Sequence, residues 1–202
     1  MKKRLGRFWS LSALLFATVF SRPLYAHSPA LEHSKTHLAS LQQVLSDPKL
    51  VGDEHLFQRR KLMRAVLQQL FDFKEMSRRS LGANARRYKD RLGEFTPLFV
   101  DLLEHIYMGA LEKNGDATIQ YITENIDGEN VQINTKTRLK DGSEYSVDYK
   151  LYLSPVGWRA HDVIVEGISL VNNYRSQFDR VLTKKSFDAL LQDLREKKET
   201  FN

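Results

Sequence analysis

Two groups of side chains have the residue types used in general acid–base catalysis. One is the adjacent pair His161-Asp162, and the other is the set Tyr145, Asp148 and Tyr149. Both lie in stretches that read as β-strands, in which successive side chains point to opposite faces. His161 and Asp162 are then poorly placed to hydrogen-bond each other, and Asp148 lies on the face opposite to both tyrosines. We therefore predict that the chain is not an enzyme, and we expect Asp162 to support a turn or to pair with a nearby donor.

Metal and thiol chemistry are also disfavoured by residue type and spacing. His105 follows Glu104 but has no second ligand at metal-binding spacing, and His27, His33 and His37 form only a sparse group near the N-terminus. There is no cysteine, which excludes disulfides, thiolate catalysis and a lipid-modified cysteine. We predict no metal and no cofactor.

Basic side chains occur in short clusters that could contact anions. The clusters are Arg59-Arg60-Lys61, Arg78-Arg79 and Arg86-Arg87. Solvated helix faces are the simpler interpretation, although a basic rim could attract anionic lipid headgroups or an acidic partner. Arg175 is the best single polar candidate for a headgroup contact, and a salt bridge or a helix-end contact is the alternative.

The first 26 residues have the three zones of a secretory signal peptide: a basic start, an apolar run at 8–20 and a polar end at Ala26. The run of 13 apolar residues is short of the roughly 20 that a membrane-spanning helix needs, so we expect cleavage near Ala26. Five of the 31 basic residues lie in this leader, which leaves 26 against 25 acidic ones. This balance gives no support for nucleic-acid binding.

The first part of the mature chain has helical periodicity. Leucines at helical spacing predict a helix from Leu31 up to Asp47-Pro48, where proline disfavours helix in the residue before it. A second helix is expected from about Asp53, and a short third one over 71–81 is ended by Gly82.

Thr96 and Pro97 together predict the start of a longer helix, as the N-cap and the first helical residue. Its apolar face consists of Phe99, Leu102, Leu103, Ile106 and Ala110.

From Ala117 onward the periodicity changes to two, which is typical of half-buried strands. Asp141-Gly142 predicts a hairpin turn, after which the apolar residues alternate with polar ones. The apolar face of this strand consists of Tyr145, Val147, Tyr149, Leu151 and Leu153. We expect an α+β fold, in which a four-stranded antiparallel sheet is packed on one face by helices and is wet on the other.

The segment 158–178 predicts a strand, a turn and the start of a helix. Three consecutive β-branched residues, Val163, Ile164 and Val165, suggest a strand covered on both faces. Glu166-Gly167 ends the strand, and Ser169 is a plausible N-cap for the helix that follows. Strand and helix should therefore share a core.

This segment resembles the MlaC-like family, the periplasmic phospholipid-binding components of the Mla lipid-transport system, also called toluene-tolerance auxiliary proteins. The residues that carry the resemblance are Trp158, Asp162-Val163, 166–171 and 173–178, with further similarity at 71–76, Ser80-Leu81-Gly82 and 95–107. The pattern departs at 83–87, where the family usually has a His-Trp pair after the glycine.

The resemblance implies an apolar cavity between sheet and helices that holds lipid tails, whereas periodicity alone favours a filled core. The side chains expected to line it are Phe73, Met76, Phe99, Leu102, Leu103, Ile106, Ile133, Tyr145, Val147, Tyr149, Leu151, Val163, Val165 and Tyr174. Nine residues of strand from Tyr145 to Leu153 span about 30 Å, roughly twice the depth of one leaflet.

The function implied by the resemblance is that of a monomeric periplasmic carrier, with residues 27–202 as a single domain. It would bind phospholipid by its tails and move it between an outer-membrane lipoprotein complex and an inner-membrane ABC transporter, which maintains outer-membrane lipid asymmetry. Carriage of another apolar lipid such as a hopanoid is one alternative, and a small cavity enzyme is the less favoured one.

Overall fold

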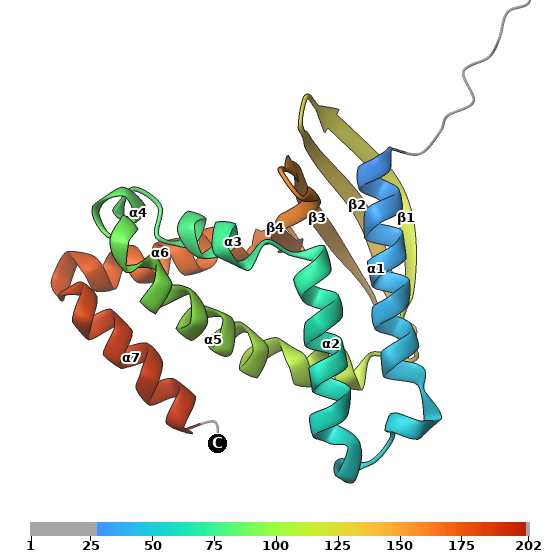
Figure 1. The fold of residues 1–202 in the computed structure, drawn as a ribbon. Helices are drawn as coiled ribbons and strands as arrows, with labels where there is room; N and C mark the ends of the chain where they lie inside the picture. The colour runs from blue at the N-terminus through green and yellow to red at the C-terminus, as the bar shows by residue number, and fades with distance from the viewer. Residues whose placement is uncertain (1–27, 201–202) are drawn as a thin grey trace, which may run out of the picture.

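The computed structural model describes residues 28–200, with side chains up to Lys198. The predicted leader and its cleavage site at Ala26 lie outside these residues. Figure 1 shows two parts: a sheet half, in which α1 (Pro29–Ser46) and α2 (Leu56–Leu70) lie in front of a β-sheet, and a helical half built from α3 to α7. None of the described helices is both long and apolar enough to cross a membrane.

The first two helices form where the leucine spacing predicts them. Ser28 caps α1 by accepting the Leu31 amide at 3.1 Å, and the helix ends before Asp47-Pro48 as expected. Two short 3₁₀ turns, Pro48–Leu50 and Asp53–His55, then lead into α2. The helix expected from about Asp53 is therefore confirmed, although its first turn is 3₁₀.

The chain enters the helical half through α3 (Phe73–Ser80), which ends at Gly82 with φ at 56°. The stretch 83–87, where the sequence departs from the family pattern, forms a single helical turn, α4 (Asn84–Arg87). Ala85 in this turn is buried, so the local departure still contributes to the core.

The longest helix, α5 (Leu92–Lys113), begins earlier than predicted. Thr96 is not its N-cap and Pro97 is not its first residue, because a 3₁₀ turn at Lys89–Arg91 already directs the chain into the helix. Pro97 leaves the carbonyl of Gly93 without an intrahelical donor, but Gly93 is exposed and water can satisfy that oxygen. The early start places Phe95 fully inside the helical half.

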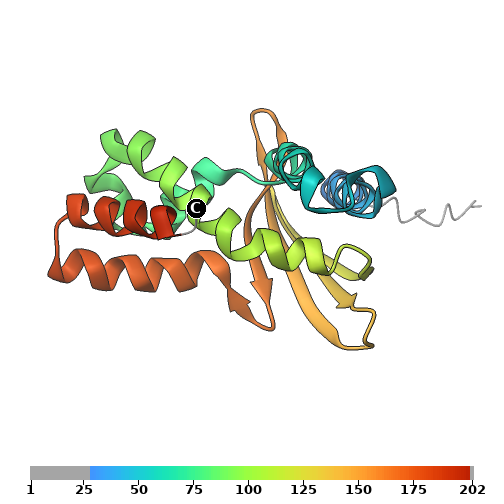
Figure 2. The ribbon, with the colours of Figure 1, turned by 90° about the horizontal axis from the view of Figure 1, so that it is seen from below.

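The sheet is an antiparallel meander in the order β1-β2-β3-β4-β5. Its strands are β1 (Thr118–Asp127), β2 (Asn130–Arg138), β3 (Glu144–Ser154), β4 (Gly157–Val165) and the two-residue β5 (Ile168–Ser169). Four long strands match the prediction, and β5 is an addition. Figure 2 shows α1, α2 and the end of α5 on one side of the sheet, which we call its inner face; the opposite side is the outer face.

The turn between β4 and β5 explains the extra strand. Glu166 and Gly167 both have positive φ, at 49° and 77°, which folds the chain back tightly so that Val165 pairs with Ile168. Ser169 then caps α6 (Leu170–Lys184) by accepting the Asn172 amide at 3.0 Å, as predicted.

The last helix, α7 (Phe187–Thr200), packs against α5 and α6 and completes the helical half.

Buried apolar side chains form three separate groups. The largest fills the helical half, and its aromatic members Phe95, Phe99, Tyr174, Phe178 and Phe187 stack or meet edge to face at 4.2–6.1 Å with each other and with Tyr88. The second joins α1 and the end of α2 to the inner face through Val131, Ile133, Tyr149 and Leu151. The third, around Leu41, Met63 and Met108, lies where α1, α2 and α5 meet.

Candidate functional site

The pair His161-Asp162 lies at a β-bulge, which corrects one prediction. Lys150 pairs with Asp162 and Leu151 pairs with Ala160, so His161 is an extra residue in β4. The strand alternation fails here, and both side chains line the same cavity instead of pointing to opposite faces.

Asp162 has the structural role predicted for it. Its carboxylate accepts the Ser169 hydroxyl at 2.6 Å and the Val171 amide at 3.0 Å, which fixes the start of α6 to β4. The bulge therefore serves the junction between strand and helix, and the Asp162 carboxylate is already used by two donors.

The second candidate set for acid–base chemistry is divided by the sheet as predicted. Asp148 lies on the outer face, where Asn134 donates to it at 2.8 Å, and Tyr145 and Tyr149 lie on the inner face. Burial raises the pKa of Tyr149 above its ordinary value, so this hydroxyl stays protonated at neutral pH. No acid–base pair results from this set.

The histidines at the start of the chain contact each other without forming a metal site. The rings of His33 and His37 lie 4.2 Å apart, and burial lowers the pKa of His33 to about 4. His27 is outside the described residues, and His105 is exposed on α5. Within residues 28–198, no group of three His, Asp or Glu side chains could hold a metal ion.

Two of the three basic clusters make specific ion pairs, whereas Arg86-Arg87 makes none among the described residues. Arg59 and Arg60 both reach Glu112, which joins α2 to α5. Arg78 and Arg79 share Glu75 at 2.6 and 2.7 Å.

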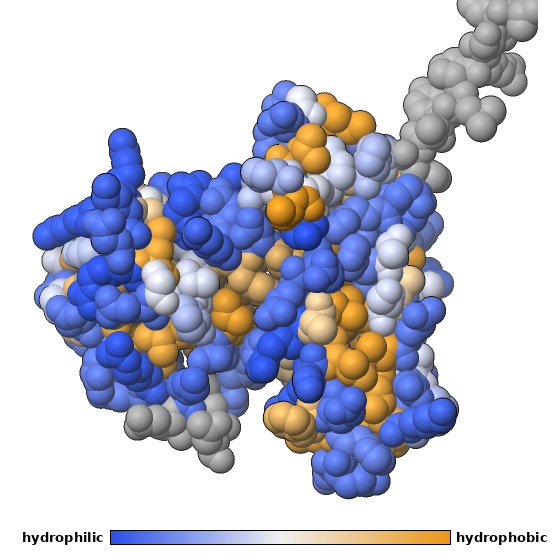
Figure 3. All heavy atoms as spheres, viewed as in Figure 1, coloured by the Kyte–Doolittle hydropathy of each residue, from blue (hydrophilic) through white to orange (hydrophobic). Residues whose placement is uncertain are grey.

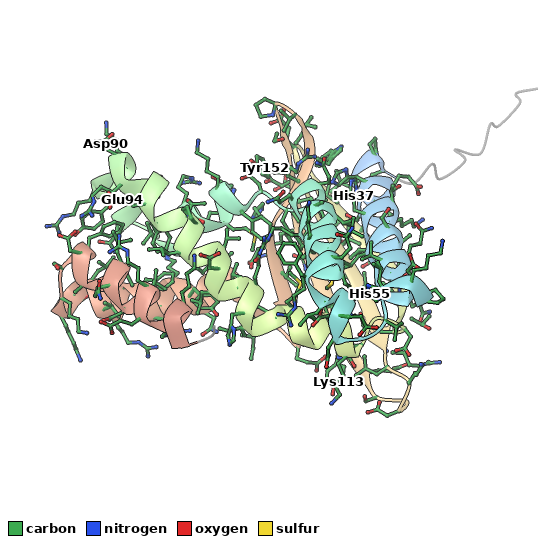
Figure 4. The ribbon with its side chains drawn as sticks, turned by 60° about the horizontal axis from the view of Figure 1, so that its bottom comes forward. His37, His55, Asp90, Glu94, Lys113 and Tyr152 are labelled. Atoms are coloured by element: carbon green, nitrogen blue, oxygen red, sulfur yellow. The ribbon has the colours of Figure 1, made fainter. Side chains whose placement is uncertain are left out.

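A hydrogen bond that the sequence did not predict fixes the two halves to each other. The Tyr152 hydroxyl donates to Asp72 at 2.5 Å, and the Asp72 amide donates to the carbonyl of Ala160 at 2.9 Å. Figure 4 shows Tyr152 between the sheet and the helical half. Asp72 also caps α3 by accepting the Glu75 amide. The segment around Phe71 is thereby held against the sheet, where it belongs to both the helical core and the sheet core.

Exposure along the inner face of β3 is lowest at Leu151 and rises in both directions. Leu153, near the end of the strand, is 43% exposed. Leu151 is fully buried, Tyr149 is 7% exposed, Val147 is half-buried and Tyr145 is 42% exposed. The paired strand follows the same trend, because Val163 opposite Tyr149 is half-buried and Val165 opposite Val147 is 42% exposed. The prediction that this strand is covered on both faces is wrong at Val165.

We call the four residues Tyr145, Val147, Val163 and Val165 the apolar wall. Val147 and Val163 lie at the margin of the sheet core and are only half-buried, whereas Tyr145 and Val165 beyond them are each 42% exposed.

Helix α5 has a similar gap in its packing. Leu102 and Leu103 are buried in the helical core and Met108 is buried in the third group, but Ile106 and Tyr107 between them are 45% and 38% exposed. The hydroxyl of Tyr107 contacts that of Tyr174, whose pKa is raised mainly by burial. Tyr107 was not among the predicted cavity residues. The sequence signal that could have found it is its position directly after Ile106, on a helix whose apolar residues are not confined to one face.

The fourteen predicted cavity residues therefore divide into two sets. Eight of them are packed in a core: Met76, Phe99, Leu102, Leu103, Ile133, Tyr149, Leu151 and Tyr174. Six keep accessible apolar surface: Phe73, Ile106, Tyr145, Val147, Val163 and Val165.

The packing of the whole domain suggests why these six residues keep accessible apolar surface. A domain of this size usually has one contiguous core, whereas here three groups of buried residues surround a region where apolar side chains remain accessible. Figure 3 shows the surface hollowed between the helical half and α2, with hydrophobic atoms at the floor of the hollow. Such an arrangement can bind an apolar ligand.

Comparison with known proteins identifies a family and solved structures of similar fold. The family model described as MlaC protein matches residues 35–196. The phospholipid-binding protein from Ralstonia solanacearum, solved in complex with a phospholipid, superposes with a TM-score of 0.76 at 23% sequence identity. The match covers 86% of this chain and 99% of that one, and at this identity it shows the fold. No curated protein matches the chain significantly.

Proposed function

The chain belongs to the MlaC family, a family of periplasmic lipid carriers and not of enzymes, and from this premise we propose that it binds a phospholipid by its acyl tails. The observation that carries the proposal is the uncovered apolar wall of β3 and β4, on the side of the sheet that α5 also crosses. The structure of similar fold from Ralstonia solanacearum, which contains a phospholipid, supports the same ligand class.

We assign different roles to the two sets of predicted cavity residues. The six with accessible surface contact the tails, together with Tyr107, and the eight buried ones hold the walls in place. Each methylene removed from water contributes about 0.8 kcal/mol, so a 16-carbon tail contributes on the order of 12 kcal/mol before the costs of binding. Burial on this scale is what allows a carrier to withdraw a lipid from a membrane.

The cellular role follows from the family and is part of the proposal. The carrier moves phospholipid between an outer-membrane lipoprotein complex and an inner-membrane ABC transporter, and this traffic maintains the lipid asymmetry of the outer membrane. The leader is cleaved near Ala26, and residues 27–202 then act as a monomeric single domain. The family match at 35–196 extends over nearly all of that domain.

Lipid extraction from protein purified out of the periplasm tests the proposal. Native mass spectrometry should show a species heavier than the polypeptide by one phospholipid, and the extract should contain phosphorus and fatty acid. A hopanoid in the extract, in place of phospholipid, would show that the protein carries another apolar lipid. Lipid-free protein that also fails to take up phospholipid from vesicles would contradict the carrier function.

A further inference from the structure

A polar cavity of about 330 Å³ lies where α3, the start of α6 and strands β3 and β4 meet. Four of its lining side chains are cationic: Arg78, Arg79, Lys150 and Arg175. Lys150 comes from the outer face of the sheet, opposite to the apolar wall, because it alternates with Tyr149 and Leu151. This cavity is therefore separate from the surface assigned to the lipid tails.

The acidic groups at the cavity do not neutralise these four charges. Glu75 pairs with Arg78 and Arg79 together, and burial, which alone would raise the pKa of Glu75, is outweighed by these two arginines, so the pKa is lowered. Asp162 supplies the only other carboxylate, and it already accepts from Ser169 and Val171. The four cationic side chains are therefore balanced by only two carboxylates at the cavity, those of Glu75 and Asp162.

Two of the cations have no partner. In the described part of the chain, neither the side chain of Lys150 nor that of Arg175 makes a hydrogen bond or an ion pair. Both line the cavity, so their charges are available to an anion that enters it.

A buried imidazole faces the same cavity without a hydrogen-bond partner. His161 is 7% exposed, and its Nδ1 has no partner among the described residues. Burial, with a smaller effect of Arg79, lowers the pKa of His161 to about 4, so the ring is neutral at pH 7. A buried polar atom without a partner is costly, so a small rotation of the ring that brings this nitrogen to a ligand oxygen in the cavity would remove that cost.

The position of Arg175 is set by the backbone beneath it. Gly82 has φ at 56°, and a Cβ at this residue would lie 2.7 Å from Nε of Arg175. Glycine therefore allows the Arg175 side chain to lie across the turn and reach the cavity. The first amides of α6 are already bonded to Asp162 and Ser169, so the side chains, rather than the helix terminus, make up the site.

We propose that this cavity is a binding site for a phosphate group, held by Arg175, Lys150 and His161 and bordered by the Arg78-Arg79-Glu75 cluster. Arginine presents a planar fork of donors that matches phosphate oxygens, and lysine adds a compact charge beside it. The phosphate belongs either to the headgroup of a carried lipid or to a free phosphorylated molecule.

Isothermal titration calorimetry with inorganic phosphate tests the site on protein stripped of lipid. We expect saturable binding at low ionic strength that weakens as NaCl is added. Acetate, which has one planar carboxylate, should bind at least about tenfold more weakly, because a hydrogen bond to a charged group changes affinity by about this factor. Equal binding of acetate and phosphate would overturn the assignment to phosphate.

Variants assign the binding to the cavity. Arg175→Gln and Lys150→Gln should each weaken phosphate binding about tenfold or more. Arg180→Gln is the matched control, because Arg180 is exposed on the same helix α6 and outside the cavity, and it should bind like the wild type. Because Arg175 is exposed, its replacement should leave the thermal unfolding midpoint unchanged. Wild-type affinity in both cavity variants, or no phosphate binding at all, would overturn the proposal.

The same titration on phospholipid-loaded protein identifies the source of the phosphate, and only this arm depends on the proposed function. Loss of inorganic phosphate binding on loading would assign the cavity to the headgroup. Unchanged binding would assign it to a free phosphorylated molecule. If the protein cannot be loaded, the carrier function fails while phosphate binding by the stripped protein still supports the site.

Discussion

The helical core and the apolar wall are built from similar residues but packed to different degrees. In the helical half, Phe95 and Phe99 are completely buried and lie edge to face with Phe178. On the sheet, Tyr145 and Val165 have the same apolar character but remain 42% exposed. The difference indicates that exposure, and not residue type, separates the part of this molecule that we propose binds the ligand from the part that holds the fold together.

The largest effect should come from truncating the helical core. Phe99→Ala removes a fully buried ring and should lower the free energy of unfolding by about 3–5 kcal/mol, because the loss of burial and the cavity left behind both destabilise the fold. Urea denaturation monitored by circular dichroism measures this. A loss below about 1 kcal/mol would mean that the helical half is also loosely packed, and the contrast with the wall would disappear.

Two residues on β3 test the same difference between buried and accessible positions within one strand. Leu151→Ala at the buried end of β3 should cost about 2–5 kcal/mol. Val147→Ala, four residues along on the same face, should cost less than about 1 kcal/mol because Val147 is only half-buried. Equal losses in the same urea experiment would show that the inner face is filled along its whole length.

Acid should weaken the sheet half and its junction with the helical half through the half-buried His33 and the buried His161. The pKa values of His33 and His161 are lowered from 6.5 to about 4, so between these pH values the unfolded chain binds more protons than the folded one. Stability should therefore fall as the pH decreases from about 6.5 towards 4, by on the order of 2 kcal/mol in total after allowing for partial exposure.

Replacing one histidine provides the control for this pH dependence. His161→Phe cannot be protonated, so the decrease in unfolding midpoint between pH 6.5 and 4 should be smaller in this variant than in the wild type. An identical decrease in both proteins would exclude His161 as a source.

The sequence predicted the fold where local signals decide the structure. Alternating residues and Asp141-Gly142 specify the β2–β3 hairpin, and Ser169 specifies the start of α6. The errors occur where a neighbouring turn or a bulge overrides the local signal. The 3₁₀ turn at Lys89–Arg91 starts α5 before Thr96, and the bulge at His161 has no glycine to mark it.

The candidate site was predictable only as a set of apolar faces. All fourteen predicted residues are apolar strand or helix residues, as periodicity requires, but their exposure depends on how α5 and the sheet are placed by contacts far apart in sequence. The hydrogen bond between Tyr152 and Asp72, 80 residues apart, is one such contact. For the same reason the sequence could not predict that Gly82, Lys150 and His161 lie at the same cavity as Arg175.

Lipid loading of Val147→Trp tests the central claim most directly, because a bulky side chain at this half-buried position, at the margin of the sheet core, should extend into the space of the tails. Ser146→Trp is the matched control, since it adds the same side chain one residue away on the outer face. With phospholipid quantified after vesicle incubation and thermal unfolding measured in parallel, Val147→Trp should lose most bound lipid while its unfolding midpoint stays near that of Ser146→Trp. Full loading of Val147→Trp, or loss of loading only together with unfolding, would contradict the account.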